Sequence, residues 1–249
     1  SYKHNIPIGE NVKYINPKLS FDGNNFWFSV SVELDDYDND NKEKTEPIGI
    51  DLGIKDFAIV SNGIVKRNIN KTVKCKKLEK QLKREQRCLS RKYEDLKKHN
   101  KKMKGEATRQ NIQKQVLKVQ RLHHRIDNIR TDYINKIIAE IVKTKPSYIT
   151  IEDLNVKGMM KNKHLSKSVA SQKFYEFRIK LEAKCKELGI ELRIVDRWYP
   201  SSKLCHECGC IKKDLKLSDR DYICQCGYHA DRDYNASLNL RDAISYKIA

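Results

Sequence analysis

A short apolar strand that ends in an acid constrains this chain more than any other feature. Residues 47–55 read Pro-Ile-Gly-Ile-Asp-Leu-Gly-Ile-Lys, which places Asp51 near the end of an apolar stretch. Residues 148–154 repeat the arrangement and carry Glu152. A carboxylate at the end of a buried strand is costly unless it coordinates a cation or finds hydrogen-bond partners. The two segments therefore predict a sheet that presents acids where its strands end.

A third acidic segment opens the last helical run of the chain. Its residues 231–233 read Asp-Arg-Asp. Taken singly, these acids have ordinary alternatives: Asp is a common N-cap, Asp51 could cap a turn, and Glu152 could pair with a lysine. Brought together, three carboxylates suit a hard divalent cation such as Mg²⁺ or Mn²⁺. We predict that the three segments converge to bind one.

The amino-terminal part predicts a strand pair followed by a linker. Residues 26–34 alternate apolar and polar side chains, which indicates a strand with one buried face. A weaker strand at residues 12–19 could pair with it across Asp22-Gly23. Residues 35–46 are mostly charged and lack periodicity, so we expect a linker. Because two strands alone are marginally stable, this piece should dock on a larger structure or end one.

The rest of the chain mixes strands and helices. Residues 47–67 predict three strands in a meander, with a hairpin turn at Ser61-Asn62-Gly63. Apolar residues three and four apart predict two long antiparallel helices at 73–98 and 108–142, the second ended by Pro146. After the strand that carries Glu152 we expect three further elements: a polar loop to Ser166, a helix over 169–188 capped by Gly189, and a strand over 190–195.

The charge of the chain points to a polyanionic partner. Lys and Arg number 51 against 33 Asp and Glu, for a net charge of +18. The absence of an apolar run of about 18 residues and of a secretory signal argues against a membrane. An isolated charge run usually serves solubility, but the first long helix is lopsided enough to favour phosphate contacts. Its basic residues are Lys74, Lys76, Lys77, Lys80, Lys83, Arg84, Arg87, Arg91 and Lys92.

Two closely spaced cysteine pairs predict a structural Zn²⁺ site. The pairs are separated by fifteen residues, as in a zinc ribbon, although the second pair has one intervening residue instead of two. Their four thiols are Cys205, Cys208, Cys224 and Cys226. Cys210 could replace a ligand, and buried free thiols are the plain alternative. The remaining cysteines, Cys75, Cys88 and Cys185, are expected to be packing residues. A metal site built from thiols favours a reducing compartment, so we expect the protein in the cytoplasm.

Four linked motifs carry a resemblance to a known family. They are Gly49-Ile50-Asp51-Leu52-Gly53, Ile151-Glu152-Asp153-Leu154, the run from Pro200 to Gly209, and the run from Cys226 to Ala236. Together they resemble the TnpB (OrfB) proteins of bacterial insertion sequences, relatives of the type V CRISPR effector nucleases. The resemblance covers residues 47–245 in order. It implies an α/β fold: an RNase H-like (RuvC) mixed sheet with a long helical-hairpin insertion and a small zinc-ribbon insertion.

The same resemblance implies the site and the domain boundaries. Asp51, Glu152 and Asp233 match the catalytic acids of a two-metal nuclease that cuts target DNA under a guide RNA, and Asp231 is left as a helix cap. Lys157, Lys161 and Lys163 become candidates to hold the guide–target duplex. The expected parts are 1–46 (end of a WED-like β-barrel plus linker), 47–72, 146–200 and 231–249 (RuvC-like), 73–145 (helical hairpin) and 201–230 (zinc ribbon).

Two departures and two alternatives accompany this interpretation. The family's amino-terminal barrel and helical recognition region are mostly absent, and the second cysteine pair is a short variant. Since the chain also starts at Ser1, we expect upstream residues that it needs to select its target. The alternatives are a catalytically inactive nucleic-acid-binding regulator of the same fold and an unguided structure-specific nuclease. The first fits a chain that has lost an acid, and all three positions are filled here. The second leaves the cysteine pairs and the basic helices unexplained.

Overall fold

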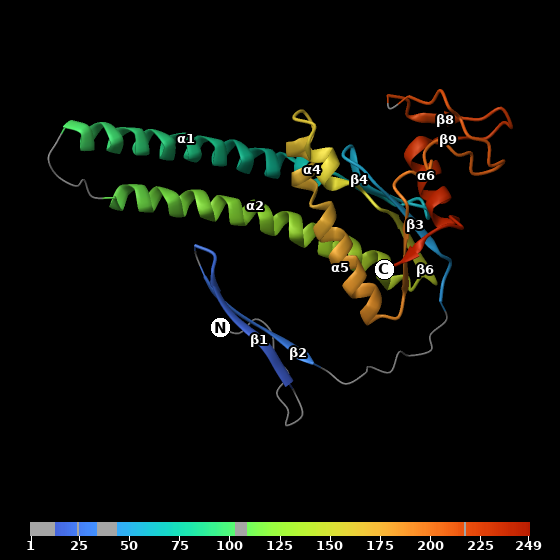
Figure 1. The fold of residues 1–249 in the computed structure, drawn as a ribbon, viewed down its shortest axis with the longest axis horizontal. Coiled ribbons are helices and arrows are strands. Elements are labelled where there is room, and N and C mark those ends of the chain that lie inside the picture. Colours follow the sequence, from blue (N-terminus) through green and yellow to red (C-terminus); the bar gives the residue numbers. More distant parts are fainter. Residues whose placement is uncertain (1–12, 24, 34–43, 103–108, 217) are drawn as a thin grey trace. The chain divides into compact units, whose positions relative to one another are not determined.

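The computed structural model describes residues 13–23, 25–33, 44–102, 109–216 and 218–249. The chain divides into two compact units. One comprises Ser1–Asp40 with Val73–Ile129, and the other comprises Asn41–Thr72 with Arg130–Ala249. Figure 1 shows the elements of each unit. The second unit holds all three candidate acids and all four candidate zinc ligands, so the site can be described within one unit.

The first unit is built on two long helices, as predicted. They are α1 (Val73–Lys102) and α2 (Gln110–Lys143), of which the part up to Ile129 belongs to this unit. Leu78 packs with Leu122 and Ile126, and Gln115 donates to the Glu85 carboxylate at 2.8 Å. Pairing of early α1 with late α2 residues confirms the antiparallel arrangement. No helix in the described ranges is long and apolar enough to cross a membrane.

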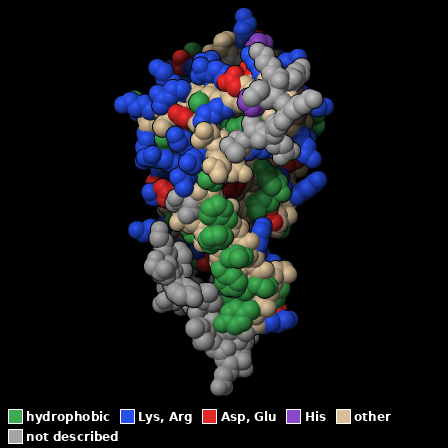
Figure 2. All heavy atoms as spheres, turned by 90° about the vertical axis from the view of Figure 1, so that its left-hand side faces the viewer, with side chains coloured by type: hydrophobic (Ala, Val, Ile, Leu, Met, Phe, Trp, Pro, Cys, Tyr) green, Lys and Arg blue, Asp and Glu red, His purple; other side chains and the backbone are tan. Residues whose placement is uncertain are grey.

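The strand pair of this unit forms as predicted, but its buried face does not. β1 (Lys13–Phe21) pairs antiparallel with β2 (Phe26–Glu33), and Gly23 takes φ +86° in the turn. Phe26 and Phe28, expected to be covered, are 75% and 61% exposed. A two-stranded ribbon has no second layer of its own, and no described element covers this face. Figure 2 shows hydrophobic side chains gathered on the hairpin. Most of the predicted linker lies outside the described residues.

The second unit contains a six-stranded mixed sheet in the order β10-β7-β6-β3-β4-β5. β3, β6 and β7 run parallel to one another, and the other pairs are antiparallel. The predicted meander is confirmed as β3, β4 and β5, and the strands after the helices as β6 and β7. The bounds are β3 Ile48–Leu52, β4 Asp56–Val60, β5 Val65–Arg67, β6 Tyr148–Glu152, β7 Glu191–Val195 and β10 Lys247–Ile248.

The two faces of this sheet are covered by different helices. Ile48 and Ile50 face a core formed with the end of α2 and with α4 (Ser166–Gln172) and α5 (Phe174–Glu187). Side chains alternate along a strand, so Gly49 and Asp51 face the other side. There α6 (Arg232–Arg241) packs so closely on β3 that a Cβ at Gly49 would collide with the Ser237 carbonyl. Glycine is therefore required at position 49 for α6 to reach the sheet.

Two sequence-based expectations about the helices are wrong. The segment from Glu152 to Ser166 is not a plain loop, because α3 (Val156–Met160) forms where the Asn155 side chain accepts from the Gly158 amide. The single helix over 169–188 is broken into α4 and α5 at Lys173, whose φ is +57°. Local propensity could not reveal this break, since tertiary packing imposes it. The cap at Gly189 is confirmed by its φ of +63°.

The remaining elements are short. η1 (Ile69–Lys71) leads from the meander towards α1, and β8 (Asp221–Ile223) pairs antiparallel with β9 (His229–Asp231). The β8–β9 hairpin continues directly into α6 (Figure 1). Its turn carries the second cysteine pair, so the cysteines and the last acidic segment are joined by only a few residues.

Candidate active site and cysteine cluster

Asp51 and Glu152 lie at the same edge of the sheet. β3 and β6 are parallel neighbours in which Ile50 pairs with Ile151, so the two acids are the next residues on adjacent strands. Both alternate with side chains buried in the α2–α5 core, which directs them to the face covered by α6. The sheet thus brings together two carboxylates from distant segments, on the face that carries the third.

The electrostatics of this edge are unfavourable for three bare carboxylates. The pKa of Asp51 is raised to about 7, mostly by burial and then by the charges of Asp233 and Glu152, while Arg232 opposes them. Burial also raises the pKa of Glu152 to about 7, with help from Asp153 and Asp196. Like charges that disfavour each other's ionisation signal a place where a bound cation would relieve repulsion. This donor set therefore fits a hard divalent metal.

The structure distinguishes the two acids of the last segment. Asp231 is the N-cap of α6, since one of its carboxylate oxygens accepts from the Asp233 and Tyr234 amides at 2.9 and 3.0 Å. Asp233 lies in the first turn and is the acid whose charge acts most strongly on Asp51. Its own carboxylate accepts from Arg232 at 2.9 Å and lies 3.5 Å from Arg220. The predicted capping role of Asp231 is confirmed.

Sequence reasoning missed the role of the residue after Glu152. Burial alone would raise the pKa of Asp153, but hydrogen bonds from Arg197 and Arg178 outweigh it and lower the pKa. Arg178 lies 2.6 Å and Arg197 lies 2.7 Å from the Asp153 carboxylate. Neither arginine belongs to a motif quoted above, so no sequence signal indicated them. The result is a net positive group beside the acidic edge.

The four predicted cysteines form a compact cluster. Their sulfur atoms all lie within 4.8 Å of one another. The Sγ atoms of Cys205 and Cys226 are 3.7 Å apart, and those of Cys208 and Cys224 are 3.5 Å apart. Four thiolates bound tetrahedrally at about 2.3 Å would be separated by about 3.8 Å, so this donor set fits Zn²⁺. Cys210 lies outside the group.

The other cysteines behave largely as predicted. Cys75 and Cys185 are buried, and Cys88 is half-buried. Burial raises the pKa of the Cys185 thiol to about 11, which keeps it protonated and unreactive. These thiols pack in the interior and are not needed for a metal site.

Two buried asparagines that the sequence analysis did not single out fasten the cysteine loop to α6. Asn235 donates to the Leu204 carbonyl at 2.8 Å and accepts from the His206 amide at 3.2 Å. Asn239, one turn later, donates to the carbonyls of Ser201 and Leu204 at 2.7 Å each. Both side chains are buried. The helix that carries Asp233 therefore also holds the first cysteine pair.

The two sites differ in how tightly their ligands are gathered. Among the residues that the structure describes, the cysteines are the one group of three or more potential ligands that meets the 4.8 Å spacing.

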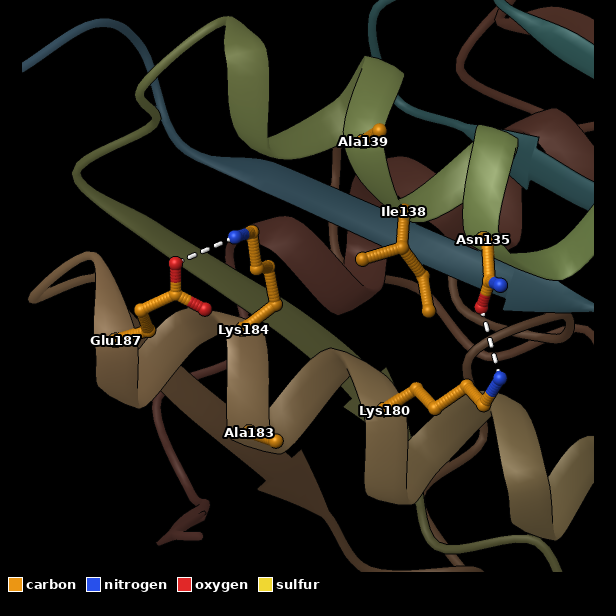
Figure 3. Close-up of a pocket in the computed structure, with 7 residues that line it drawn as sticks. All are labelled: Asn135, Ile138, Ala139, Lys180, Ala183, Lys184 and Glu187. Atoms are coloured by element: carbon orange, nitrogen blue, oxygen red, sulfur yellow. Dashed lines mark hydrogen bonds and ion pairs between the residues drawn. The ribbon is translucent and has the colours of Figure 1, made fainter. Parts of the chain in front are cut away.

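A hollow of about 340 Å³ lies between α2 and α5 (Figure 3). It is lined by Ile138, Ala183 and the Lys184–Glu187 pair but by none of the acids. It is therefore separate from the candidate active site.

The basic residues predicted to contact phosphate lie on the surface of the first unit. Of the nine on α1, eight are exposed, and Lys92 is half-buried, where it donates to the Asn111 carbonyl. Figure 2 shows lysine and arginine side chains spread over the face around the helices. The acids on α1 are fewer, so this surface keeps a positive charge.

Comparison with known proteins places this architecture in a family. A model described as "Probable transposase" (IS605 OrfB) matches residues 29–163, and a Cas12f1-like TNB domain model matches residues 174–240. A solved Cas12f1–sgRNA–target DNA complex resembles the fold with a TM-score of 0.53 and 22% identity, over 81% of this chain and 39% of that one. The likeness supports the mixed α/β fold.

Curated relatives agree with these models. A "Putative RNA-guided DNA endonuclease" of Streptomyces pristinaespiralis is 33% identical over 94% of this chain and 54% of its own length. The corresponding Escherichia coli protein, InsQ, is 34% identical over 78% of this chain and 48% of its own. The chain thus spans about half the length of the curated relatives it matches. Since the transposase model covers more than half of the chain, this protein belongs to the IS605 OrfB family, as its motifs predicted.

Proposed function

We propose that this chain carries the catalytic part of a transposon-encoded, RNA-guided DNA endonuclease with an RNase H-like (RuvC) sheet. The position of Asp51 carries the proposal: it lies beside Glu152 on the neighbouring parallel strand, and the charge of Asp233 on α6 acts on it, an arrangement that a bound divalent cation would stabilise. Its relatives are named RNA-guided DNA endonucleases. The guide RNA and the target DNA are the proposed partners, in keeping with the net charge of +18.

In this proposal the three acids hold Mg²⁺ or Mn²⁺. Two such ions, when bound, activate water and stabilise the leaving oxygen of a phosphodiester. Asp51 lies between Glu152 on the neighbouring strand and Asp233 on α6, and both charges act on it, so it is the ligand best placed to serve both ions. Asp233, whose carboxylate accepts from Arg232 and lies 3.5 Å from Arg220, would be the third ligand.

The remaining parts handle nucleic acid. We assign 73–145 to a helical insertion and 201–230 to a zinc ribbon, with the sheet formed by the segments between and after them. The exposed basic face of α1 and the lysines at 157, 161 and 163 contact the backbone of the guide–target duplex. Sequence is then read by base pairing and not by the protein. Zn²⁺ at the four cysteines has a structural role, because the protein fills all four positions.

The test begins with the nucleic acid that co-purifies with the protein. Sequencing it should identify one RNA species that includes a transposon end and a variable segment. DNA matched to that segment should be cut in Mg²⁺ by a form extended to the length of the relatives, and Asp51→Asn should abolish cutting while leaving RNA bound. Absence of a specific RNA would favour the unguided nuclease. Bound RNA without cutting in any divalent metal would favour the inactive regulator.

A further inference from the structure

A rigid loop follows β7 at the same edge of the sheet as the acids. β7 runs parallel to β6, with Val195 paired to Glu152, and the Asp153 amide donates to the Val195 carbonyl at 2.8 Å. The chain therefore leaves β7 at the level of Glu152. The loop that begins there, residues 196–200, lies beside the candidate active site.

Both ends of this loop are fixed by contacts with the body of the unit. Arg197 donates to the Asp153 carboxylate at 2.7 Å. The Tyr199 hydroxyl donates to the Asn239 carbonyl of α6 at 3.2 Å, and its side chain packs in a small core with Val195. Such anchors on either side leave little freedom to the residue between them.

That residue is Trp198, and its side chain is 84% exposed. Its amide donates to the Asp196 carboxylate at 2.8 Å, which closes a local turn and holds the backbone. Among the described residues, no aromatic ring stacks on the indole and no group forms a hydrogen bond with it. Tryptophan brings a large apolar surface that normally gains from burial. A solvent-exposed indole on a fixed backbone is preorganised to stack on a planar ring.

We propose that Trp198 stacks on an unpaired base of the nucleic-acid strand that lies at the acidic edge. Bases stack on exposed aromatic rings in sequence-independent single-strand sites, commonly beside cationic groups. Here Arg197, the residue before Trp198, and Arg178 supply cationic groups beside the loop, next to the carboxylates of Asp153 and Asp196. The inference rests on the proposed function for the identity of the strand. It makes Trp198 a positioning residue that places the phosphodiester next to its base.

The test uses Trp198 as its own reporter. The chain contains two tryptophans, so Trp27→Phe leaves Trp198 as the single source of indole fluorescence. Titration of the RNA-free protein with oligo-dT in buffer without Mg²⁺ or Mn²⁺, and without a chelator that would remove zinc, should quench this fluorescence to saturation. Trp198→Ala should weaken single-strand binding by about 5- to 150-fold, corresponding to one stacked base. The affinity of Trp198→Phe should lie between those of the wild type and of Trp198→Ala. Ile244→Ala is the matched control, since Ile244 is 96% exposed in the same unit.

The outcomes separate this inference from the proposed function. Unquenched fluorescence together with equal single-strand affinity of wild type and Trp198→Ala would overturn it and leave the indole for a protein contact. A loss that is equal for single-stranded and duplex DNA would also overturn it, because stacking needs an unpaired base. If Asp51→Asn still cuts DNA but quenching is observed, the proposed catalytic acids are wrong and the stacking site stands.

Discussion

The cysteine cluster and the acidic edge lie in one structural unit and were both predicted as metal sites, yet they are assembled to different degrees. The four sulfurs lie within 4.8 Å of one another without an ion. The acids share an edge, but Asp233 is held by two arginines, and the pKa of Asp51 is raised to about 7 by burial and then by Asp233. The cysteines are already gathered at metal-binding distance, whereas one of the three acids is paired with arginines.

The difference follows from ligand chemistry and chain distance. The cysteine pairs sit in two short loops, so the backbone gathers the thiols, which are neutral when protonated. The acids come from β3, β6 and α6, and the charges of Asp233 and Glu152 disfavour ionisation of Asp51. A structural site can be formed by local turns, whereas a catalytic one needs the whole sheet and a cation to draw it together. Four predictions test this contrast, from the largest expected effect to the smallest.

Removal of zinc should have the largest effect. Elemental analysis should give about one Zn per chain. Cys205→Ser should release the metal and expose residues 202–231 to protease, because zinc binding contributes on the order of 10 kcal/mol in small zinc domains. Cys210→Ser, a thiol outside the cluster, is the matched control and should change neither result. An unchanged cleavage pattern in metal-free protein would mean that the loops hold their shape alone.

The two acids of the last segment should differ in their effect on activity. Asp233→Ala should reduce Mg²⁺-dependent cleavage by more than about 100-fold, exceeding the loss typical of an outer-shell partner, with nucleic-acid binding retained. Asp231→Ala should lose the cap of α6 and about 1 kcal/mol of stability. Cleavage assays on the extended form and thermal melts measure the two. The opposite ranking would show that the ligand was misassigned.

Removing the contacts between α6 and the cysteine loop should have a smaller effect than either of the changes above. Asn239→Ala should destabilise the protein by about 1–3 kcal/mol, because the buried Ser201 carbonyl loses its side-chain donor while the Leu204 carbonyl keeps only the one from Asn235. Zinc should stay bound, while protease should reach the loop more readily. Asn135→Ala, which removes an exposed contact with Lys180, is the control. Loss of zinc in the Asn239 variant would show that α6 holds the cluster together and is not merely attached to it.

The smallest effect should be on the pH dependence of stability. The folded pKa of Asp51 lies near 7, above the ordinary aspartate value of 3.8. The folded state therefore binds more protons than the unfolded state, and the stability of metal-free protein should fall as pH rises from 4 to 7. Asp51→Asn should remove part of that slope and gain about 1–2 kcal/mol at pH 8. Mg²⁺ should flatten the slope of wild type but not of the variant. A stability that rises towards pH 8 without metal would contradict the repulsion.

Much of this molecule could be predicted from the sequence because the signals were local. Strand alternation, helical periodicity and turn residues gave β3 to β7, the two long helices and the cap at Gly189. Cysteine spacing alone indicated which four thiols would cluster. The motif around Asp231 indicated a helix N-cap, and the structure has one. In each case, the residues that specify the feature are close neighbours in the chain.

Tertiary structure alone decided the features that depend on contacts between distant segments. Asn239 is buried against Ser201 and Leu204, which lie more than 30 residues earlier, and Phe26 is exposed because no described element packs on its face of the hairpin. The sequence named Asp51 as an acid at a strand end, but only parallel pairing of β3 with β6 places Glu152 beside it. Only the anchoring of Arg197 and Tyr199 leaves Trp198 in solvent. The periodicity of a sequence indicates on which face of a strand or helix a residue lies. Only the packing of that strand or helix against others determines which residues the face contacts.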